Sequence, residues 1–384
     1  MPSAFHVTTS AADLQAVHES LYTDTAGALR TLEAMLPSLR TEDATPQLAR
    51  ALELQSIGNR ILGHYEAALA QNAESLTLFR ALGDRAGVAK AGLLAGNIHW
   101  CLGAFEKALA LYESALALRR ELGDRRGEAG ALGSIGVVLD DLGRYAEARR
   151  CYEESLALSE AFEDRAFAAR TLNNLGETCL NLAEFGAARA HCERALALFR
   201  ALDDRAEEAN ALSNLGKIHR ALGDFTRAAE CFRAALAVSR ATGDQRSQAE
   251  AQLFLGALHT EPGAAFYSPG AALDLLESAL AQAEALRAGA VVSTVHRELA
   301  RAHELAGHPV AALAHHRKFH DIHTEVFGEE SSRRLRHLQI SYELDHARHE
   351  AERERHPCGR LVFKRGQVWT LLAHGQDLLD LLTY

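Results

Sequence analysis

Histidine is concentrated in the carboxyl-terminal part of this sequence, where 12 of its 19 copies follow residue 295. His316, His320 and His323 have i, i+4, i+7 spacing, so one helix face would present all three, with His303 and His315 close in sequence. A row of neutral imidazoles can bind zinc or nickel. No carboxylate or cysteine completes a known spacing such as His-Glu-x-x-His. We therefore expect a polar, partly exposed helix face, with no metal, no other cofactor and no catalytic residue.

A second set of polar side chains recurs through the middle of the chain on one helical face. Its members are Lys90, Asn97, Trp100, Asp140, Arg170, Asn173, Asn174, Glu177, Asn210, Asn214, Lys217 and Arg220. A side-chain amide can donate to a carbonyl and accept from an amide hydrogen, so it suits an extended backbone. Lys217 or Arg220 could pair with an acidic group, and Trp100 could anchor a ligand. Alternatively, the asparagines solvate this face or bond to a neighbouring helix, and Trp100 packs against the next repeat.

The elements that would position these side chains recur every forty residues. The tripeptides LGD, LGD, FED, LDD and TGD end at Asp84, Asp124, Asp164, Asp204 and Asp244. An aspartate before a helical run caps it, because the carboxylate accepts the free amide hydrogens of the first turn. Glu207 can complete a capping box with Asp204. Five such caps at one period predict tandem repeats.

Each period predicts two helices of about the same length, joined by a short turn. Small residues recur where the helices must approach closely. They are Gly96, Gly136, Gly176, Gly216 and Gly256 in the first helices, and Ala108, Ala148, Ala188 and Ala228 in the second. Large residues fill the space between them: Phe105, Tyr145, Phe185 and Phe225 after the turn, and Tyr112, Tyr152 and Phe232 further along. This alternation predicts an all-α stack of antiparallel helix pairs.

The pattern resembles the tetratricopeptide repeat family. The core of one repeat is shown by Gly216, His219, Gly223, Phe225, Ala228, Phe232 and Ala235. The family's usual period is 34 residues; the forty-residue form is similar to the repeats of G-protein-regulating scaffold proteins and of bacterial Rap peptide-sensing regulators. The resemblance implies a right-handed superhelix whose first helices line a concave groove that holds extended peptides. The family's early aromatic is replaced by Gly92, Leu132, Leu172 or Leu212.

Domain organisation follows from these periods. We expect a helical cap or degenerate repeat over 1–44 and seven repeats over 45–329. The repeats are assigned to 45–84, 85–124, 125–164, 165–204, 205–244, 245–289 and 290–329. The first is expected to be shifted by about two residues near Gly58, and the sixth has an enlarged turn, EPGAAFYSPG.

A charged stalk helix is predicted over 330–355, where six acidic and six basic side chains occur. Ile340, Leu344, Ala347 and Ala351 form a short coiled-coil seam, which predicts either a homodimer or a single solvated helix. The segment resembles the sequence that follows tetratricopeptide arrays in bacterial signalling proteins such as diguanylate cyclases and histidine kinases. Phe327, Glu330, Ser331, Leu338, Gln339 and Glu343 carry that match. No output-domain signature follows, and 356–384 is expected to be a short tail.

Composition excludes several function classes. The net charge of −10 argues against binding of nucleic acid or anionic membranes. The sequence contains no apolar run of about 18 residues, so we expect no membrane-spanning helix. Six cysteines without a Cys-x-x-Cys pair favour free thiols in a reducing cytoplasm. We expect a cytoplasmic, non-catalytic scaffold that binds a protein or peptide in bacterial signalling. The alternatives are a dimerising regulatory subunit of a separate cyclase or kinase, and a metal-binding protein acting through the histidines.

Overall fold

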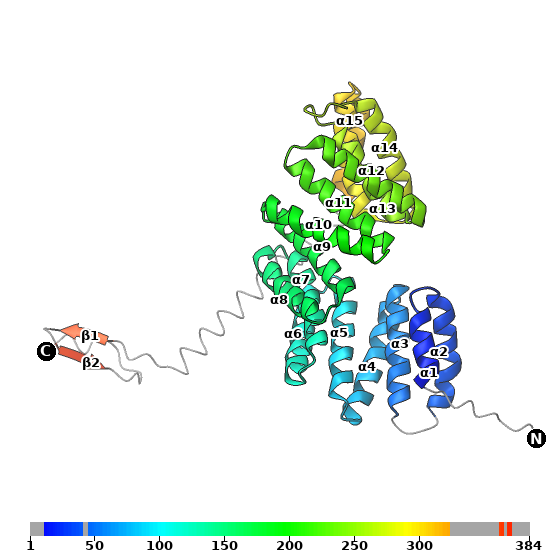
Figure 1. Cartoon of the computed structure of the whole chain (residues 1–384), viewed down its shortest axis with the longest axis vertical. Helices are drawn as coiled ribbons and strands as arrows, with labels where there is room; N and C mark the ends of the chain where they lie inside the picture. The colour runs from blue at the N-terminus through cyan, green and yellow to red at the C-terminus, as the bar shows by residue number, and fades with distance from the viewer. Residues whose placement is uncertain (1–10, 41–44, 323–360, 365–366, 371–384) are drawn as a thin grey trace, which may run out of the picture. The chain divides into compact units, whose positions relative to one another are not determined.

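The computed structural model describes residues 11–40, 45–322, 361–364 and 367–370. The chain forms two compact units, Met1–Val326 and Phe327–Tyr384. In the first unit the described regular elements are α-helices, as predicted (Figure 1). They are α1 (Ala11–Ser20), α2 (Thr25–Leu39), α3 (Pro46–Ile61), α4 (Tyr65–Ala81), α5 (Arg85–Cys101), α6 (Phe105–Glu121), α7 (Arg125–Asp141), α8 (Tyr145–Ala161), α9 (Arg165–Asn181), α10 (Phe185–Ala201), α11 (Arg205–Ala221), α12 (Phe225–Thr242), α13 (Gln245–Leu258), α14 (Pro269–Ala285), α15 (Gly289–Leu305) and a helix over 309–322.

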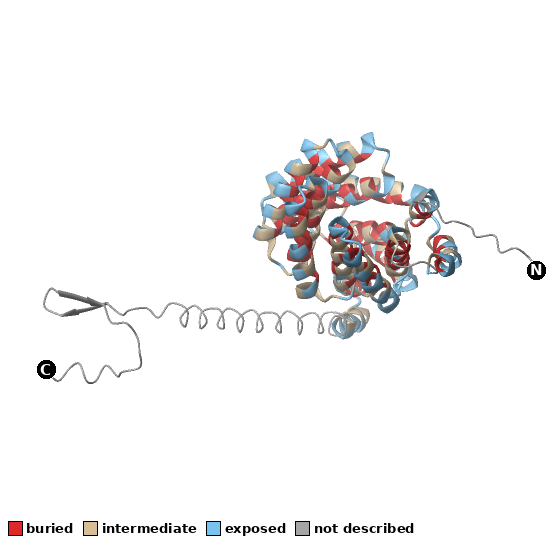
Figure 2. Cartoon of the chain, turned by 90° about the horizontal axis from the view of Figure 1, so that it is seen from below, coloured by how far each residue is buried: buried red, intermediate tan, exposed pale blue. Residues whose placement is uncertain are grey.

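The helices pack as antiparallel pairs that stack in chain order. The closest contacts join α3 to α4, α5 to α6 and so on along the array, and each second helix also contacts the first helix of the next pair. Figure 2 shows the buried residues on the helix sides that face other helices, with exposed residues on the outer sides. This one-dimensional stacking is an α-solenoid, in which each repeat is stabilised by its neighbours.

The aspartates of the repeated tripeptides cap the first helices as expected. Asp84, Asp124, Asp164 and Asp204 each accept a hydrogen bond from the amide three residues later, and Asp244 accepts from Arg246 and Ser247. The residue before each aspartate is left-handed: Gly83, Gly123, Glu163, Asp203 and Gly243 have φ from 54° to 75°. The glycine of the LGD and TGD tripeptides therefore serves a backbone requirement.

The predicted capping box at Asp204 is only half formed. The amide of Glu207 donates to the Asp204 carboxylate at 3.2 Å. The reciprocal bond is missing, because the Asp204 amide already donates to the carbonyl of Phe199 at 3.0 Å. Glu207 instead accepts a bond from the side chain of Asn210.

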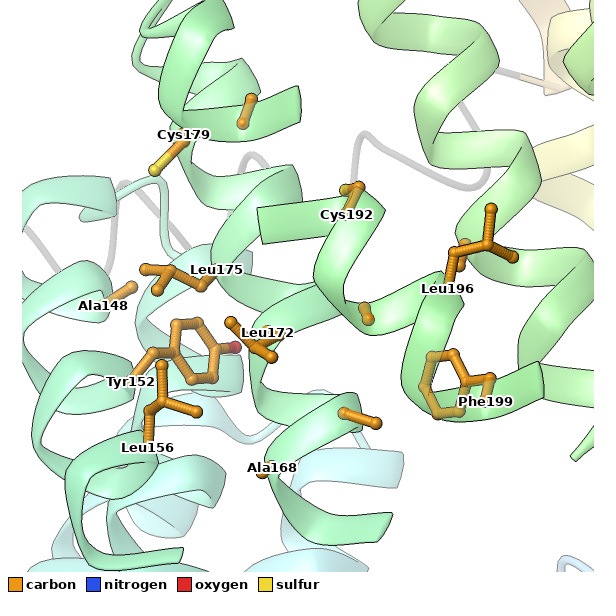
Figure 3. Close-up of a cluster of buried hydrophobic side chains, with 14 of the residues drawn as sticks. Ala148, Tyr152, Leu156, Ala168, Leu172, Leu175, Cys179, Cys192, Leu196 and Phe199 are labelled. Atoms are coloured by element: carbon orange, nitrogen blue, oxygen red, sulfur yellow. The ribbon is translucent and has the colours of Figure 1, made fainter. Parts of the chain in front are cut away.

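The predicted small-against-large packing forms the core of each helix pair. A Cβ atom placed on Gly96, Gly136 or Gly216 would lie 2.4–2.6 Å from the ring of Tyr112, Tyr152 or Phe232 respectively. In the next pair along from Tyr152, Gly176 faces the smaller Cys192. Figure 3 shows Tyr152 directed toward Leu172 and Leu175, so the aromatic ring also joins one pair to the next. The glycines are therefore required by close packing.

The first repeat keeps the forty-residue register, so the shift expected near Gly58 is wrong. The left-handed turn residue Gly63 lies forty residues before Gly103. Ser56 takes the place of Gly96, and its buried hydroxyl donates to the carbonyl of Ala68 at 2.8 Å. A small polar residue thus replaces glycine at the close approach between α3 and α4.

The second unit contains a two-stranded antiparallel sheet of β1 (Leu361–Lys364) and β2 (Gln367–Thr370). Leu361 pairs with Thr370 and Lys364 with Gln367. The predicted stalk over 330–355 lies outside the described residues, so its dimerisation stays a prediction. Cys358 also lies outside them, whereas Cys101, Cys151, Cys179, Cys192 and Cys231 are free thiols.

Candidate functional site

The first helices of the repeats form the inner side of the array. Within the described array, α3, α5, α7, α9, α11 and α13 each contact the next first helix, whereas no such contact joins successive second helices. Helices that are two elements apart approach each other only on the shorter side of a curved stack. We call this side of the array, which the first helices form, the concave row. It carries the polar residues that were predicted to bind a ligand.

Part of the concave row is joined into a network between α9 and α11. The Asn214 Nδ2 atom donates to Oδ1 of Asn173 at 3.2 Å. Lys217 Nζ donates to Asn214 Oδ1 at 3.1 Å and to Glu177 Oε1 at 3.2 Å. Asn173 and Asn214 are buried, and Lys217 also lies 5.3 Å from the centre of the Phe254 ring. These four polar side chains satisfy one another, so they hold neighbouring repeats together.

Arg220 belongs to a second network at the carboxyl-terminal end of the concave row. Its Nη2 atom lies 2.7 Å from Oε1 of Glu261, and Nη2 of Arg301 lies 3.2 Å from Oε2 of the same carboxylate. Burial opposes the charge of Glu261, but the two guanidinium groups outweigh it and lower the pKa of the carboxyl. Arg220 and Lys217 are therefore each paired with a carboxylate of the chain, and neither is a free cation for an acidic ligand.

Trp100 contacts the next repeat and also remains partly exposed, so its role as a ligand anchor stays a prediction. Its indole Nε1 donates to Oδ2 of Asp141 on the next first helix at 2.5 Å. The side chain nevertheless keeps 37% of its surface exposed. A partly exposed aromatic ring that is anchored by a hydrogen bond can stack against a ligand with little loss of side-chain entropy.

Asp140 is a half-buried carboxylate in the middle of the concave row. Its Oδ2 atom accepts a hydrogen bond from Thr178 of α9 at 2.8 Å. Burial, with smaller contributions from Glu177 and Asp141, raises the pKa of the carboxyl to about 6, although bonds from Thr178 and Tyr152 oppose the shift. Asp140 therefore titrates closer to neutrality than an ordinary aspartate.

The remaining predicted residues are more exposed or make fewer hydrogen bonds to the rest of the protein. Lys90, Arg170 and Asn210 are exposed, and the Arg170 guanidinium lies 5.8 Å from the centre of the Phe167 ring. Asn174 is half-buried, and no hydrogen bond of its side-chain amide to another described residue is present. Asn97 accepts a bond from the hydroxyl of Tyr112 at 2.7 Å. The available polar surface of the concave row is thus centred on Lys90, Trp100, Arg170, Asn174 and Asn210.

Four further residues of the concave row were not singled out from the sequence. Asp141, Thr178, Glu261 and Arg301 each complete a contact with a predicted residue or with its partner. Each contact joins residues 38 to 41 positions apart. Pairing polar residues at about one repeat length would have found them, because one period separates neighbouring positions on adjacent first helices.

His316 and His320 are exposed on the helix over 309–322, as expected, and His323 lies outside the described residues. Contacts between histidines involve His296, His303, His308 and His315. In the part of the chain that the structure describes, no group of three histidine, cysteine or acidic residues is arranged to hold a metal ion. Of the helices described, none is long and apolar enough to cross a membrane.

Three solved structures with a similar fold are distant from this chain in sequence. The apo form of the quorum sensor NprR from B. thuringiensis has 14% identity and a TM-score of 0.64, over 80% of this chain and 86% of that chain. Aspartyl phosphate phosphatase F from Bacillus subtilis has 15% identity and a TM-score of 0.62, over 84% and 85%. A Rap protein complexed with Competence and Sporulation Factor has 14% identity and a TM-score of 0.51, over 82% and 99%. At this identity the likeness shows the fold.

The sequence comparisons identify the repeat. No curated protein sequence matches this chain. The family model of the tetratricopeptide repeat matches residues 88–161, 167–241 and 207–263. These segments contain α6 to α8, α10 to α13 and most of α5 and α9, with the capping residues Asp124, Asp204 and Asp244 and the glycine-to-aromatic contacts described above. The central part of the chain, over residues 88–161 and 167–263, therefore consists of tetratricopeptide repeats.

Proposed function

We propose that this array is a binding scaffold that holds an extended segment of a partner protein in its concave row. The observation that carries the proposal is the set of exposed or unsatisfied side chains on α5, α9 and α11: Lys90, Trp100, Arg170, Asn174 and Asn210. They combine an aromatic face with charged groups and an amide that can bond a peptide backbone.

A glycine on the intervening helix α7 supports this proposal. Gly130 faces open space, where an added Cβ atom would meet nothing within 4 Å. Val137, about two turns further along α7, is half-buried. A helix without side chains at this point leaves room for a ligand backbone between the polar groups of α5 and α9.

A cytoplasmic signalling role fits the same surface. The similar Rap protein was solved with Competence and Sporulation Factor bound, so a related array is known to hold a separate molecule. For this chain we propose a non-catalytic role in bacterial signalling, in which occupancy of the concave row is the signal. Nucleic acid is not the proposed partner, because the net charge is −10.

Site-specific photocrosslinking tests the proposal. A photoreactive residue at position 174 on α9 is compared with one at position 189, on the second helix α10, in a bacterial lysate. We expect crosslinks at position 174 that map to one extended segment of one partner, and none to that segment from position 189. A synthetic peptide of that segment should then bind at least tenfold more weakly to a Lys90→Ala, Arg170→Ala, Asn174→Ala variant. An Arg189→Ala, Glu193→Ala variant should bind it normally, and equal affinity in all three proteins would contradict the proposal.

A further inference from the structure

Four histidines meet where the last described helix packs on the array. The Nδ1 atoms of His296 on α15 and His315 on the helix over 309–322 lie 3.0 Å apart. The ring of His303 stacks on that of His315 with 5.2 Å between centroids. The Nδ1 atom of His303 lies 3.4 Å from that of His308, in the turn between the helices. The cluster thus joins both helices and their connection.

The central pair is compatible with neutral rings. A neutral imidazole has one donor and one acceptor nitrogen, so at 3.0 Å one Nδ1 carries the hydrogen and the other accepts it. Protonation of both rings would direct two N–H groups at each other. His296 has only 1% of its surface exposed, so a charge there would lose almost all of its hydration.

The charged groups around the cluster give little compensation. The positive charge of Lys318, on the same helix as His315, disfavours protonation of both His296 and His315. Glu277 on α14 favours the charged forms of His303 and His315, but no carboxylate among the described residues acts comparably on His296. Burial, followed by His315 and Lys318, lowers the pKa of His296 to about 4, and burial also lowers the pKa of His303 and His315.

Among the described residues, the helix over 309–322 packs on the array with one side. Val310 is 83% exposed and Leu313 is 52% exposed, while His315, Phe319 and Ile322 are half-buried. Within the described residues no further repeat covers its outer face. Terminal elements of a solenoid are stabilised by a single neighbour, so a small change in interaction free energy alters their docking.

We propose that the helix over 309–322 is a proton-sensitive element: neutral His296 and His315 hold it on α15, and acidification releases it from the array. The inference is independent of the ligand proposed for the concave row. Release provides the array with a means of responding to pH.

The direction follows from the two states of His296. In the released state the imidazole regains its ordinary pKa of 6.5, whereas in the docked state its pKa is about 4. Docking is therefore fully favoured above pH 6.5 and is lost progressively as the pH falls toward 4. At pH 5.5 this one group favours release about tenfold relative to pH 7.5.

Hydrogen exchange of the full chain at pH 7.5 and 5.5, corrected for intrinsic exchange rates, tests the proposal. We expect the protection of the amides in 309–322 to fall about tenfold at pH 5.5, while that of α4, which is far from the cluster and from Asp140, stays constant. Constant protection of 309–322 in the wild-type protein would overturn the proposal, whatever any variant does.

Variants identify the responsible group. His296→Gln removes the buried ring, and the fall should shrink to less than about threefold. His315→Gln keeps a hydrogen-bonding partner for His296 at a half-buried position and should also reduce the fall. It provides the test if the His296→Gln protein does not fold. His191→Gln on α10 removes a half-buried histidine outside the cluster and should leave the fall at about tenfold. A tenfold fall that persists in both cluster variants would refute the assignment.

Discussion

The amide nitrogen of Asn214 donates a hydrogen bond to the amide oxygen of Asn173, 41 residues earlier and one repeat away. The bond is buried, and Lys217 completes it by donating to the remaining acceptor of Asn214. Residues that by type suited a ligand backbone are therefore used to fix two neighbouring first helices. Asn174, adjacent to Asn173 in sequence, is left without such a partner among the described residues.

This difference predicts opposite behaviour for two asparagines. Asn214→Ala should lower the free energy of unfolding by about 1–2 kcal/mol, because it leaves the buried Asn173 oxygen without its donor and removes one of the two acceptors of Lys217. Asn174→Ala should change the free energy by less than about 0.5 kcal/mol but weaken binding of the partner segment. Urea denaturation and peptide titration on the same preparations measure both effects. Equal destabilisation by the two substitutions would show that the network is unimportant.

Two glycines on first helices should respond oppositely to alanine. In Gly216→Ala the new Cβ atom would lie 2.4 Å from the Phe232 ring, and we expect a loss of about 1–3 kcal/mol in the free energy of unfolding. Gly130→Ala adds a methyl group in open space, so improved helix propensity should stabilise the protein by up to about 1 kcal/mol. Thermal denaturation of both variants distinguishes packing from propensity, and a loss at Gly130 would contradict the open space described there.

Glu163 offers a simple route to stabilisation. It occupies the left-handed turn position with φ of 54°, where the equivalent residues in three other turns are glycines. Glu163→Gly should raise the free energy of unfolding by about 0.5–1 kcal/mol, because the strain of a side chain at positive φ exceeds the entropy cost of glycine. Gly243→Ala at the same position of another repeat is the control and should be destabilising. A destabilised Glu163→Gly protein would mean that the turn tolerates side chains without strain.

Asp140 should make stability depend on pH between about 4 and 6. Its pKa is raised to about 6, so its contribution to stability is present below the ordinary value of 3.8 and lost as the pH rises through 6. Asp140→Asn should therefore stabilise the protein by about 1–2 kcal/mol at pH 7.5, with a smaller gain at pH 5. The exposed Asp274→Asn on α14 is the control. Urea denaturation of both variants at the two pH values would reject this prediction if the gain at Asp140 did not depend on pH.

The local chemistry of the repeat could be predicted from the sequence. Asp84 and its equivalents cap helices through contacts within three residues, and Gly216 requires only that Phe232 lie on the facing helix. Both depend on short-range spacing, which a period repeats and makes visible. Ser56 shows the limit, because a hydroxyl that bonds the carbonyl of Ala68 replaces a glycine without resembling one.

The chemistry between repeats was harder to predict. Whether Asn173 or Asn174 meets Asn214 depends on the rotation and axial offset of α9 and α11, which sequence spacing does not specify to within one residue. The contact between His296 and His315 likewise depends on how two helices cross in the last repeat. Polar residue types indicated where such contacts would form, but the partner of each one required the packed helices.

Glu261 changes how the carboxyl-terminal end of the array should unfold. In a simple solenoid each repeat interacts only with its neighbours, so the terminal one frays by itself. Glu261 binds Arg220 of the fifth repeat and Arg301 of the seventh with one carboxylate. It thereby connects α11 to α15 across an intervening repeat, at the start of the enlarged turn that interrupts the forty-residue period. The irregular turn thus extends cooperativity over three repeats, so that α15 resists fraying while the helix beyond it remains free to detach.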